Sequence, residues 1–240
     1  MNGEASNPTS QQPLAELAEG GGAEHATSSR TLAAALARCQ IALPAEQVAA
    51  LEHYAGLLWD WNERINLTRH TTFDRFAERD IVDALAVADS LAEGERVLDV
   101  GSGGGVPGVI LAITRSDLKI TLIDSVTKKA RVLEDVVTQL ALPVRVRNEA
   151  VQTHLNRHRY DTLVVRAVAR LDKVLRWLEP HWSMFSRVLM IKGPAWVEER
   201  QVARDAGLLK PLHLRRLNSY PLAGTESESV ILQISRERPD

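Results

Sequence analysis

The sequence predicts an α/β fold with a doubly wound, mostly parallel sheet, an antiparallel hairpin at the sheet edge and a small helical domain before the sheet. The first observation is an alternation that starts at Arg96, where short runs rich in branched residues alternate with longer amphipathic runs. This alternation is typical of parallel strands joined by crossover helices. The second is a glycine-rich segment directly after the first such run, and the third is a pair of extended runs near the end of the chain.

The segment before the sheet divides into a tail and a helical domain. Residues 1–30 are rich in Gly, Ser, Gln, Glu and Ala. They bury too little apolar surface to offset the conformational entropy lost on folding, so we expect a disordered tail. A helical domain is predicted over residues 31–95, where apolar residues recur at helical spacing. Its helical runs are TLAAALARCQ, PAEQVAALEHYAGLLWDWNERI and FDRFAERDIVDALAVADSL.

The sheet domain is predicted over residues 96–240. Its parallel strands are, in chain order, RVLDV, KITLID, VRVRNE, YDTLVVRAV and RVLMIKG. The helices between and after them are VPGVILAIT, TKKARVLEDVVTQLA, DKVLRWLEPHW and AWVEERQVARDAG. Two further extended runs, HLRRLNSY and SVILQIS, are separated by the turn-rich segment PLAGTESE, which predicts the antiparallel pair at the edge.

The composition argues against a membrane protein and against a metal centre. Of the 240 residues, 45% are hydrophobic and 25% are charged, and no apolar run approaches the roughly 18 residues of a membrane span. The N-terminus lacks both the basic start and the apolar core of a secretory signal. Cys39 is the single cysteine and the histidines are scattered, so we expect no structural metal. We expect a cytoplasmic monomer without membrane contact.

The charge is distributed unevenly along the chain. The formal net charge is −2, which argues against a strongly basic nucleic-acid binder. Residues 125–218 nevertheless carry 18 Lys and Arg against 9 Asp and Glu. Such a segment either presents a positive face to phosphates or places solvated cations on crossover helices, and clustering in space distinguishes the two.

The segment VLDVGSGGGVPG, residues 97–108, predicts a ligand site after the first strand. In a doubly wound sheet, ligands bind outside the carboxyl ends of the strands where the strand order reverses. Gly101, Gly103 and Gly105 lack Cβ atoms where the backbone leaves the strand, so a ligand can approach main-chain N–H groups there. Asp99 is expected at the mouth of the same cleft. A merely flexible glycine turn is the rival interpretation.

Two ligand classes fit this segment. Gly103, Gly105 and Gly108 satisfy the dinucleotide pattern and Asp124 lies near the distance expected for a ribose-binding acid, which predicts an NAD(P)-dependent oxidoreductase. Against it, an acid directly before the glycines would repel a pyrophosphate, and Pro107 has no N–H for a phosphate. S-adenosyl-L-methionine carries an ammonium, a sulfonium and no phosphate, so these residues favour that cofactor. Asp124 then accepts both ribose hydroxyls, caps the following helix, or does both.

Several segments together resemble one family. They stand in the order found in the bacterial 16S ribosomal RNA guanine-N7 methyltransferase G family, also called the glucose-inhibited division protein B family: WNERINLT, VLDVGSGGGVPG, LIDSVTKKARVL, VVRAVARL and IKG. The resemblance covers roughly residues 45–235 and is far more specific than the glycine segment alone. It implies a class I methyltransferase (Rossmann-like) fold that uses S-adenosyl-L-methionine to methylate one guanine of 16S rRNA, with the small ribosomal subunit as partner.

The resemblance also implies roles for single residues. Arg166 matches an arginine assigned to the cofactor site, and Asp124 matches the acid that binds the ribose. The other cofactor positions that it implies are Gly101 and Val106 in the glycine segment and Ala150 and Val151 beside the adenine. The implied RNA-binding positions are Asn66 and Thr68 in the NLT segment and the basic residues Lys128, Arg131 and Lys192.

The chain departs from the family pattern at several positions. These are Asp80 for His and Ala84 for Ser in RDIVDA, Gly104 for Pro or Ala, and Val151 for the acid beside the adenine. The change at Val151 leaves a contact to the adenine amino group to Asn148, Glu149 or the backbone. The departures fit a divergent member or an altered substrate, and they keep open a non-catalytic module that binds cofactor or RNA.

The chemistry implied by this acceptor needs placement rather than proton transfer. Guanine N7 has a lone pair that is free at neutral pH, so in-line methyl transfer needs no general base, and we assign no catalytic acid or base. Because N7 faces the deep groove of A-form RNA, the target guanine must be unpaired or splayed. Tyr54, Trp59 and Trp61 are candidates for stacking on a base, although Trp59 shares a helical face with Leu51 and Ala55 and is expected in the core.

Overall fold

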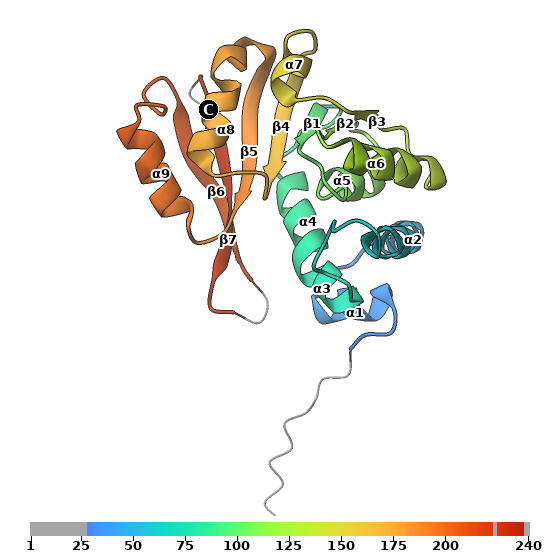
Figure 1. Cartoon of the computed structure of the whole chain (residues 1–240). Helices are drawn as coiled ribbons and strands as arrows, with labels where there is room; N and C mark the ends of the chain where they lie inside the picture. Colours follow the sequence, from blue (N-terminus) through green and yellow to red (C-terminus); the bar gives the residue numbers. More distant parts are fainter. Residues whose placement is uncertain (1–27, 223–224, 238–240) are drawn as a thin grey trace, which may run out of the picture.

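A computed structural model describes residues 28–222 and 225–237, and it contains one seven-stranded sheet. The strands are β1 (Arg96–Val100), β2 (Lys119–Ile123), β3 (Arg145–Arg147), β4 (Tyr160–Arg166), β5 (Phe185–Lys192), β6 (His213–Pro221) and β7 (Glu228–Ser235). They lie in the order β3-β2-β1-β4-β5-β7-β6 (Figure 1). The strands β1 to β5 are parallel, and β7 runs antiparallel to β5 and β6. The predicted doubly wound, mostly parallel sheet with an antiparallel pair at one edge is confirmed.

The central strands are hydrophobic along almost their whole length because the sheet is covered on both faces. In β1, Val97 and Leu98 point to opposite faces and both are fully buried. Asp99 of β1 pairs in register with Leu122 of β2 and Val164 of β4, so its backbone lies in the middle of the sheet. The carboxyl ends of β1, β2, β4 and β5 therefore meet at one edge of the molecule.

Helices cover both faces of the sheet. They are α1 (Leu32–Arg38), α2 (Ala45–Asn62), α3 (Phe73–Arg75), the π-helical turn η1 (Phe76–Ile81), α4 (Val82–Ala88), α5 (Gly108–Thr114), α6 (Thr127–Gln139), α7 (Val151–Leu155), α8 (Leu171–Leu178), the 3₁₀ turn η2 (Glu179–Met184) and α9 (Trp196–Asp205). One hydrophobic cluster buries Leu58 of α2 and Leu133 of α6 against one face. A second buries Leu175 of α8 and Ala203 of α9 against the other face.

The N-terminal helices share their core with the sheet. Side chains of α1, α2 and α4 belong to the same hydrophobic cluster as those of α5 and α6. The division into two domains at residue 95 therefore remains a prediction. Most of the tail predicted over residues 1–30 lies outside the described residues, which begin at residue 28. At that point Ser29 donates to Asp74 through its N–H, at 2.8 Å, and through its hydroxyl, at 2.6 Å.

The sequence does not predict the short helix α7. Its five residues, VQTHL, are too few to show a helical period. Its buried His154 has ring nitrogens 2.8 Å from Glu149 Oε1 and 2.7 Å from the hydroxyl of Tyr160. Val151 and Leu155 pack this helix into the second hydrophobic cluster, and the polar contacts of His154, which leave no mark in the hydrophobic pattern, join it to neighbouring segments.

Two features are absent from the part of the chain that the structure describes. No helix there is long and apolar enough to span a membrane. The same residues contain no group of three or more His, Cys, Asp or Glu placed to hold a metal ion. Cys39 is half-buried and forms no disulfide.

Candidate functional site

The candidate site is a cleft of about 520 Å³ at the carboxyl ends of the central strands. Gly101 follows β1, Ala167 follows β4 and Gly193 follows β5, and all three line the cleft. On the other side, Leu58 of α2 and Arg79 of η1 contribute to the wall. The strand order reverses between β1 and β4, which is where doubly wound sheets bind ligands.

The structure brings part of the predicted site into the cleft wall. The predicted residues that line the cleft are Gly101, Gly103, Val106, Arg166, Thr68 and Lys192. The predicted residues outside the wall are Asp99, Gly105, Asp124, Ala150, Val151, Asn66, Lys128 and Arg131.

The loop glycines serve different purposes. A Cβ at Gly101 would lie 2.7 Å from Val168 Cγ2, and one at Gly105 would lie 2.6 Å from Val109 Cγ2, so internal packing excludes a side chain at both. At Gly103, where φ is +58°, the nearest atom to a Cβ is a carbonyl oxygen 3.8 Å away. Gly101 and Gly103 both line the cleft, whereas Gly105 does not, so the expectation that all three glycines clear space for a ligand is corrected for Gly105.

Asp99 lies beneath the glycine loop and not at the cleft mouth, which corrects the sequence-based expectation. Asp99 is 1% exposed, and its Oδ2 accepts a hydrogen bond from the N–H of Gly108 at 3.1 Å. Burial raises the pKa of Asp99 to about 7, against the opposing effect of hydrogen bonds from Ser102 and Gly108. Asp99 therefore supports the loop from inside the protein and does not reach the cleft.

The start of α5 offers little to a pyrophosphate. The N–H of Gly108 is taken by Asp99, and the N–H of Val109 donates to the carbonyl of Gly105 at 2.7 Å. Pro107, directly before the helix, has no N–H to donate. Because dinucleotide sites use free N–H groups at this helix terminus, the oxidoreductase interpretation loses its binding site.

Asp124 follows β2 and holds two backbone segments together. Its Oδ2 accepts from the N–H of Gly103 at 3.0 Å, and its Oδ1 accepts from the N–H of Val126 at 2.8 Å, at the start of α6. Asn148 donates to the carbonyl of Asp124 at 3.0 Å. Each carboxylate oxygen keeps a second lone pair, so the expected binding of a ribose remains a prediction, with the helix-start contact beside it.

The residues expected beside an adenine lie at the start of α7. Ala150 is exposed, whereas the side chain of Val151 is buried in the second hydrophobic cluster, and the expected place of both beside the adenine remains a prediction. Glu149 is engaged by His154, at 2.8 Å, and by Arg157, at 3.1 Å. Asn148 is exposed, but its amide nitrogen donates to the carbonyl of Asp124, so its Oδ1 and the backbone are left for a contact to the adenine amino group.

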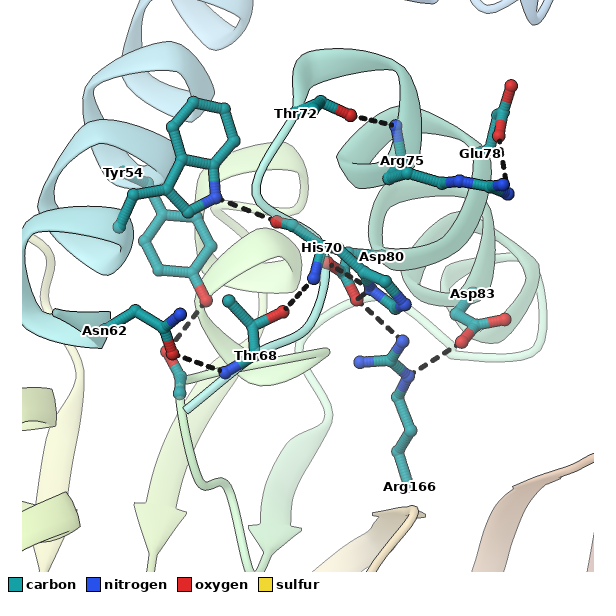
Figure 2. Close-up of polar contacts among 12 residues, drawn as sticks. Tyr54, Asn62, Thr68, His70, Thr72, Arg75, Glu78, Asp80, Asp83 and Arg166 are labelled. Atoms are coloured by element: carbon teal, nitrogen blue, oxygen red, sulfur yellow. Dashed lines mark hydrogen bonds and ion pairs between the residues drawn. The ribbon is translucent and has the colours of Figure 1, made fainter. Parts of the chain in front are cut away.

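A buried acidic pair binds Arg166 at the back of the cleft (Figure 2). The guanidinium of Arg166 donates to Asp80 at 2.6 Å and to Asp83 at 2.7 Å, and both acids are at most 3% exposed. Nδ1 of His70 lies 3.0 Å from both oxygens of Asp80, and Tyr220 donates to Asp83 at 2.6 Å. Asp80, one of the departures from the family pattern, thus belongs to a connected network. The sequence offers one signal for Asp83, since spacing by three places both acids on one helical face.

The aromatic residues of α2 make contacts within the protein, and the base-stacking role expected for Trp61 remains a prediction. Tyr54 is fully buried and donates to the carbonyl of Gly104 at 2.9 Å, so its expected role of stacking on a base is wrong. Trp59 packs on Phe73 with ring centroids 5.0 Å apart, which confirms its expected place in the core. Trp61, half-buried, donates to Asp135 on α6 at 2.7 Å.

The NLT segment is held by a residue that the sequence does not single out. Asn62 at the end of α2 accepts from the N–H groups of Leu67, at 2.8 Å, and Thr68, at 2.9 Å. Thr68 lines the cleft and accepts from the N–H of His70 at 3.0 Å. Asn66 is exposed and lies outside the cleft wall.

The basic residues of the cleft differ from those expected. Lys128 and Arg131 are exposed on α6 and do not line the cleft. Lys192 lines it but is paired with Glu199 at 2.6 Å. Three basic side chains that the sequence does not single out do line it: Lys129, Arg69 and Arg79. Within the described ranges, Nε of Arg79 is buried without a hydrogen-bond partner.

Known proteins match this chain in sequence and in fold. Residues 47–220 match the family described as rRNA small subunit methyltransferase G. The ribosomal RNA small subunit methyltransferase G of Rhodopirellula baltica is 51% identical over 179 residues, 75% of this chain and 78% of that protein. The protein of the same name from Chromobacterium violaceum is 38% identical over 165 residues, 68% and 79% of the two chains. The solved structure of the bifunctional kinase-methyltransferase WbdD, 16% identical, shares the fold with a TM-score of 0.52, covering 76% of this chain and 46% of that one.

Proposed function

Because the chain belongs to the rRNA small subunit methyltransferase G family, we propose that it transfers a methyl group from S-adenosyl-L-methionine to N7 of one guanine in 16S rRNA. The observation that carries this proposal is the match over residues 47–220, which includes every residue of the cleft lining except Ser229. We further propose that the protein acts as a monomer in the cytoplasm, where its rRNA substrate is found.

The residues of the cleft fit S-adenosyl-L-methionine. Open space beside Gly103 lets a ligand approach the backbone, and Asp124, which lies outside the cleft wall and accepts from the N–H of Gly103, keeps lone pairs for ribose hydroxyls. The buried Nε of Arg79, without a partner in the described residues, suits a carboxylate. When bound, the cofactor supplies an electrophilic methyl group on a sulfonium, which the lone pair of N7 displaces in line.

The chain's own contribution is to place the acceptor base. N7 is unprotonated at neutral pH, so no side chain has to remove a proton, and orientation alone is worth about 7 to 11 kcal/mol in favourable cases. Two carboxylates, Asp80 and Asp83, face one guanidinium, Arg166, at the back of the cleft, and the imidazole of His70 also contacts Asp80. We propose that these carboxylates complement the positive charge that develops on the guanine ring as N7 is methylated.

The test is methyl transfer to mapped RNA. The purified protein is incubated with labelled S-adenosyl-L-methionine and either unmodified 16S rRNA or 30S subunits, and N7-methylguanine is located by reduction and aniline cleavage. A single cleavage site, absent with the Gly103→Arg variant, supports the proposal. Cofactor binding without incorporation into either RNA contradicts it and supports a non-catalytic module.

A further inference from the structure

A second concave surface lies between α9 and the edge strand β6, outside the cleft. It has a volume of about 640 Å³ and is lined by five basic residues with leucines between them. We call this surface the basic groove, and its basic residues are Arg200, Arg204, Lys210, His213 and Arg215. Figure 1 shows α9 beside β6 at one edge of the sheet, across the molecule from β3.

The charge of the basic groove is not compensated inside the protein. Its lining contains no acidic side chain among the described residues. In that part of the chain, no ion pair involves its arginines or its lysine. None of the three acids of α9 lines the basic groove: Glu199 pairs with Lys192, Asp205 accepts from the uncharged amide of Gln201, and Glu198 lies in the first turn of the helix. Arg200 stacks on Trp196, with its guanidinium 4.9 Å from the ring centroid.

Protection of the sheet edge does not account for this cluster. Basic side chains on an edge strand prevent pairing with other strands, and this purpose explains His213 and Arg215 on β6. It does not explain Arg200 and Arg204, which come from a helix, or Lys210, which comes from the connection between helix and strand. Three segments therefore converge to make one positively charged concave surface.

Helix α9 connects the cleft to the basic groove, which lies toward the amino end of β5 because His213 and Arg187 pair with the same residue of β7, Ser235. Ala195 lines the cleft and stands directly before α9, and the same helix carries Arg200 and Arg204 into the basic groove. At 1.5 Å per residue, the axis of α9 spans about 14 Å from Ala195 to Arg204. An RNA chain with its target base in the cleft therefore reaches the basic groove within a few nucleotides.

We propose that the basic groove binds the phosphate backbone of the same rRNA whose guanine enters the cleft. This inference rests on the proposed function and adds to it a second contact with the substrate. Arginine and lysine contacts to phosphate position an RNA without reading its sequence. The uncompensated charge and the path along α9 are the observations that carry the inference.

The experiment measures the salt dependence of RNA binding without cofactor. The probe is unmodified 16S rRNA, and its dissociation constant is measured from 50 to 200 mM salt. Each phosphate contact contributes about 0.7 to 0.9 to the slope of log K against log salt, so Arg204→Gln with Arg215→Gln should reduce the slope by about 1.5. The matched control is Arg145→Gln with Arg159→Gln, which removes the same charge from two exposed residues outside the basic groove and should leave the slope unchanged.

Further variants separate charge from folding. Arg204→Lys with Arg215→Lys keeps the charge and should keep the slope, and thermal unfolding should be the same for all variants because these side chains are exposed. In methylation assays the groove variant should raise KM for 30S subunits several-fold without changing kcat. Equal slopes for the groove variant and the control, or no binding of 16S rRNA by the unmodified protein, overturn the inference. If the groove variant shows a reduced slope but the unmodified protein methylates neither 16S rRNA nor 30S subunits, the proposed function is refuted. The basic groove then remains an RNA-binding site.

Discussion

Nη2 of Arg166 donates to Oδ1 of Asp80 at 2.6 Å, which joins the end of β4 to the π-helical turn η1 across 86 residues of sequence. The same guanidinium neutralises Asp83. Arg166→Ala leaves two buried carboxylates without their cation, so we expect the free energy of unfolding to fall by about 3 to 5 kcal/mol. Urea unfolding checks this. Arg170→Ala, which breaks an exposed pair with Asp172, is the control and should cost less than about 1 kcal/mol. Equal losses for the two variants would contradict the buried-network assignment.

A conservative variant tests whether Arg166 also binds the cofactor. Arg166→Lys keeps a cation between Asp80 and Asp83 but loses the planar fork that contacts both. If the arginine touches the cofactor as well, the apparent dissociation constant for S-adenosyl-L-methionine should rise in a calorimetric titration at a temperature where the variant is folded. An unchanged constant in a folded Arg166→Lys protein would assign Arg166 to the protein network alone.

The raised pKa of Asp99 predicts that stability depends on pH. Burial raises this pKa from 3.8 to about 7 in the folded state. Between these values the folded state binds more protons than the unfolded state, so the free energy of unfolding falls as pH rises, by at most about 1.4 kcal/mol per pH unit. Below about pH 4 Asp99 is protonated in both states and the full stability is present. Asp99→Asn cannot ionise, so the difference between the original protein and this variant in urea unfolding should change across that window. A difference that is constant with pH would be inconsistent with the burial of an ionisable Asp99.

Substitution at one loop glycine should remove cofactor binding, and substitution at another should mainly reduce stability. Gly103→Arg places a side chain toward open space, at a φ of +58° that costs about 1 to 2 kcal/mol. The protein should fold and lose cofactor binding, because the new side chain occupies the cleft. Gly105→Ala places a Cβ 2.6 Å from Val109 Cγ2 at a φ of +108°, so it should lower the melting temperature much more. Thermal unfolding and cofactor titration check both, and undiminished binding by Gly103→Arg would remove this loop from the site.

Local patterns predict the strands, the crossover helices and the position of the cleft. The strands β1 and β4 are buried on both faces, so their apolar runs are continuous and easily recognised. The glycine segment is correctly placed at the turn after β1, but its composition has a different cause from the one expected. Gly105 and Gly108 are required because a Cβ would meet Val109 in one case and Leu122 and Asp99 in the other.

Contacts between distant segments are not predictable from these patterns. Tyr54 meets Gly104 across 50 residues, and Tyr220 meets Asp83 across 137. Helical periodicity indicates which face of α2 is apolar. It does not indicate that the hydroxyl of Tyr54, on that face, donates to the carbonyl of Gly104 in the glycine loop. The basic groove has the same origin, since a helix, a connection and a strand supply its charges. The excess of Lys and Arg over residues 125–218 indicates its charge without its location.

The hydroxyl of Tyr54 connects α2 to the glycine loop, and its removal should affect both stability and cofactor binding. Tyr54→Phe leaves the carbonyl of Gly104 buried without its donor, so we expect a loss of about 1 to 3 kcal/mol in urea unfolding. Because the loop is then held less firmly, the dissociation constant for S-adenosyl-L-methionine should also rise. Trp61→Phe is the matched control, since it removes the hydrogen bond from α2 to Asp135 on α6 and leaves the loop contact in place. It should reduce stability without changing cofactor affinity. If both variants weaken the cofactor equally, the effect comes from general loosening of α2, and the specific support of the loop by Tyr54 is excluded.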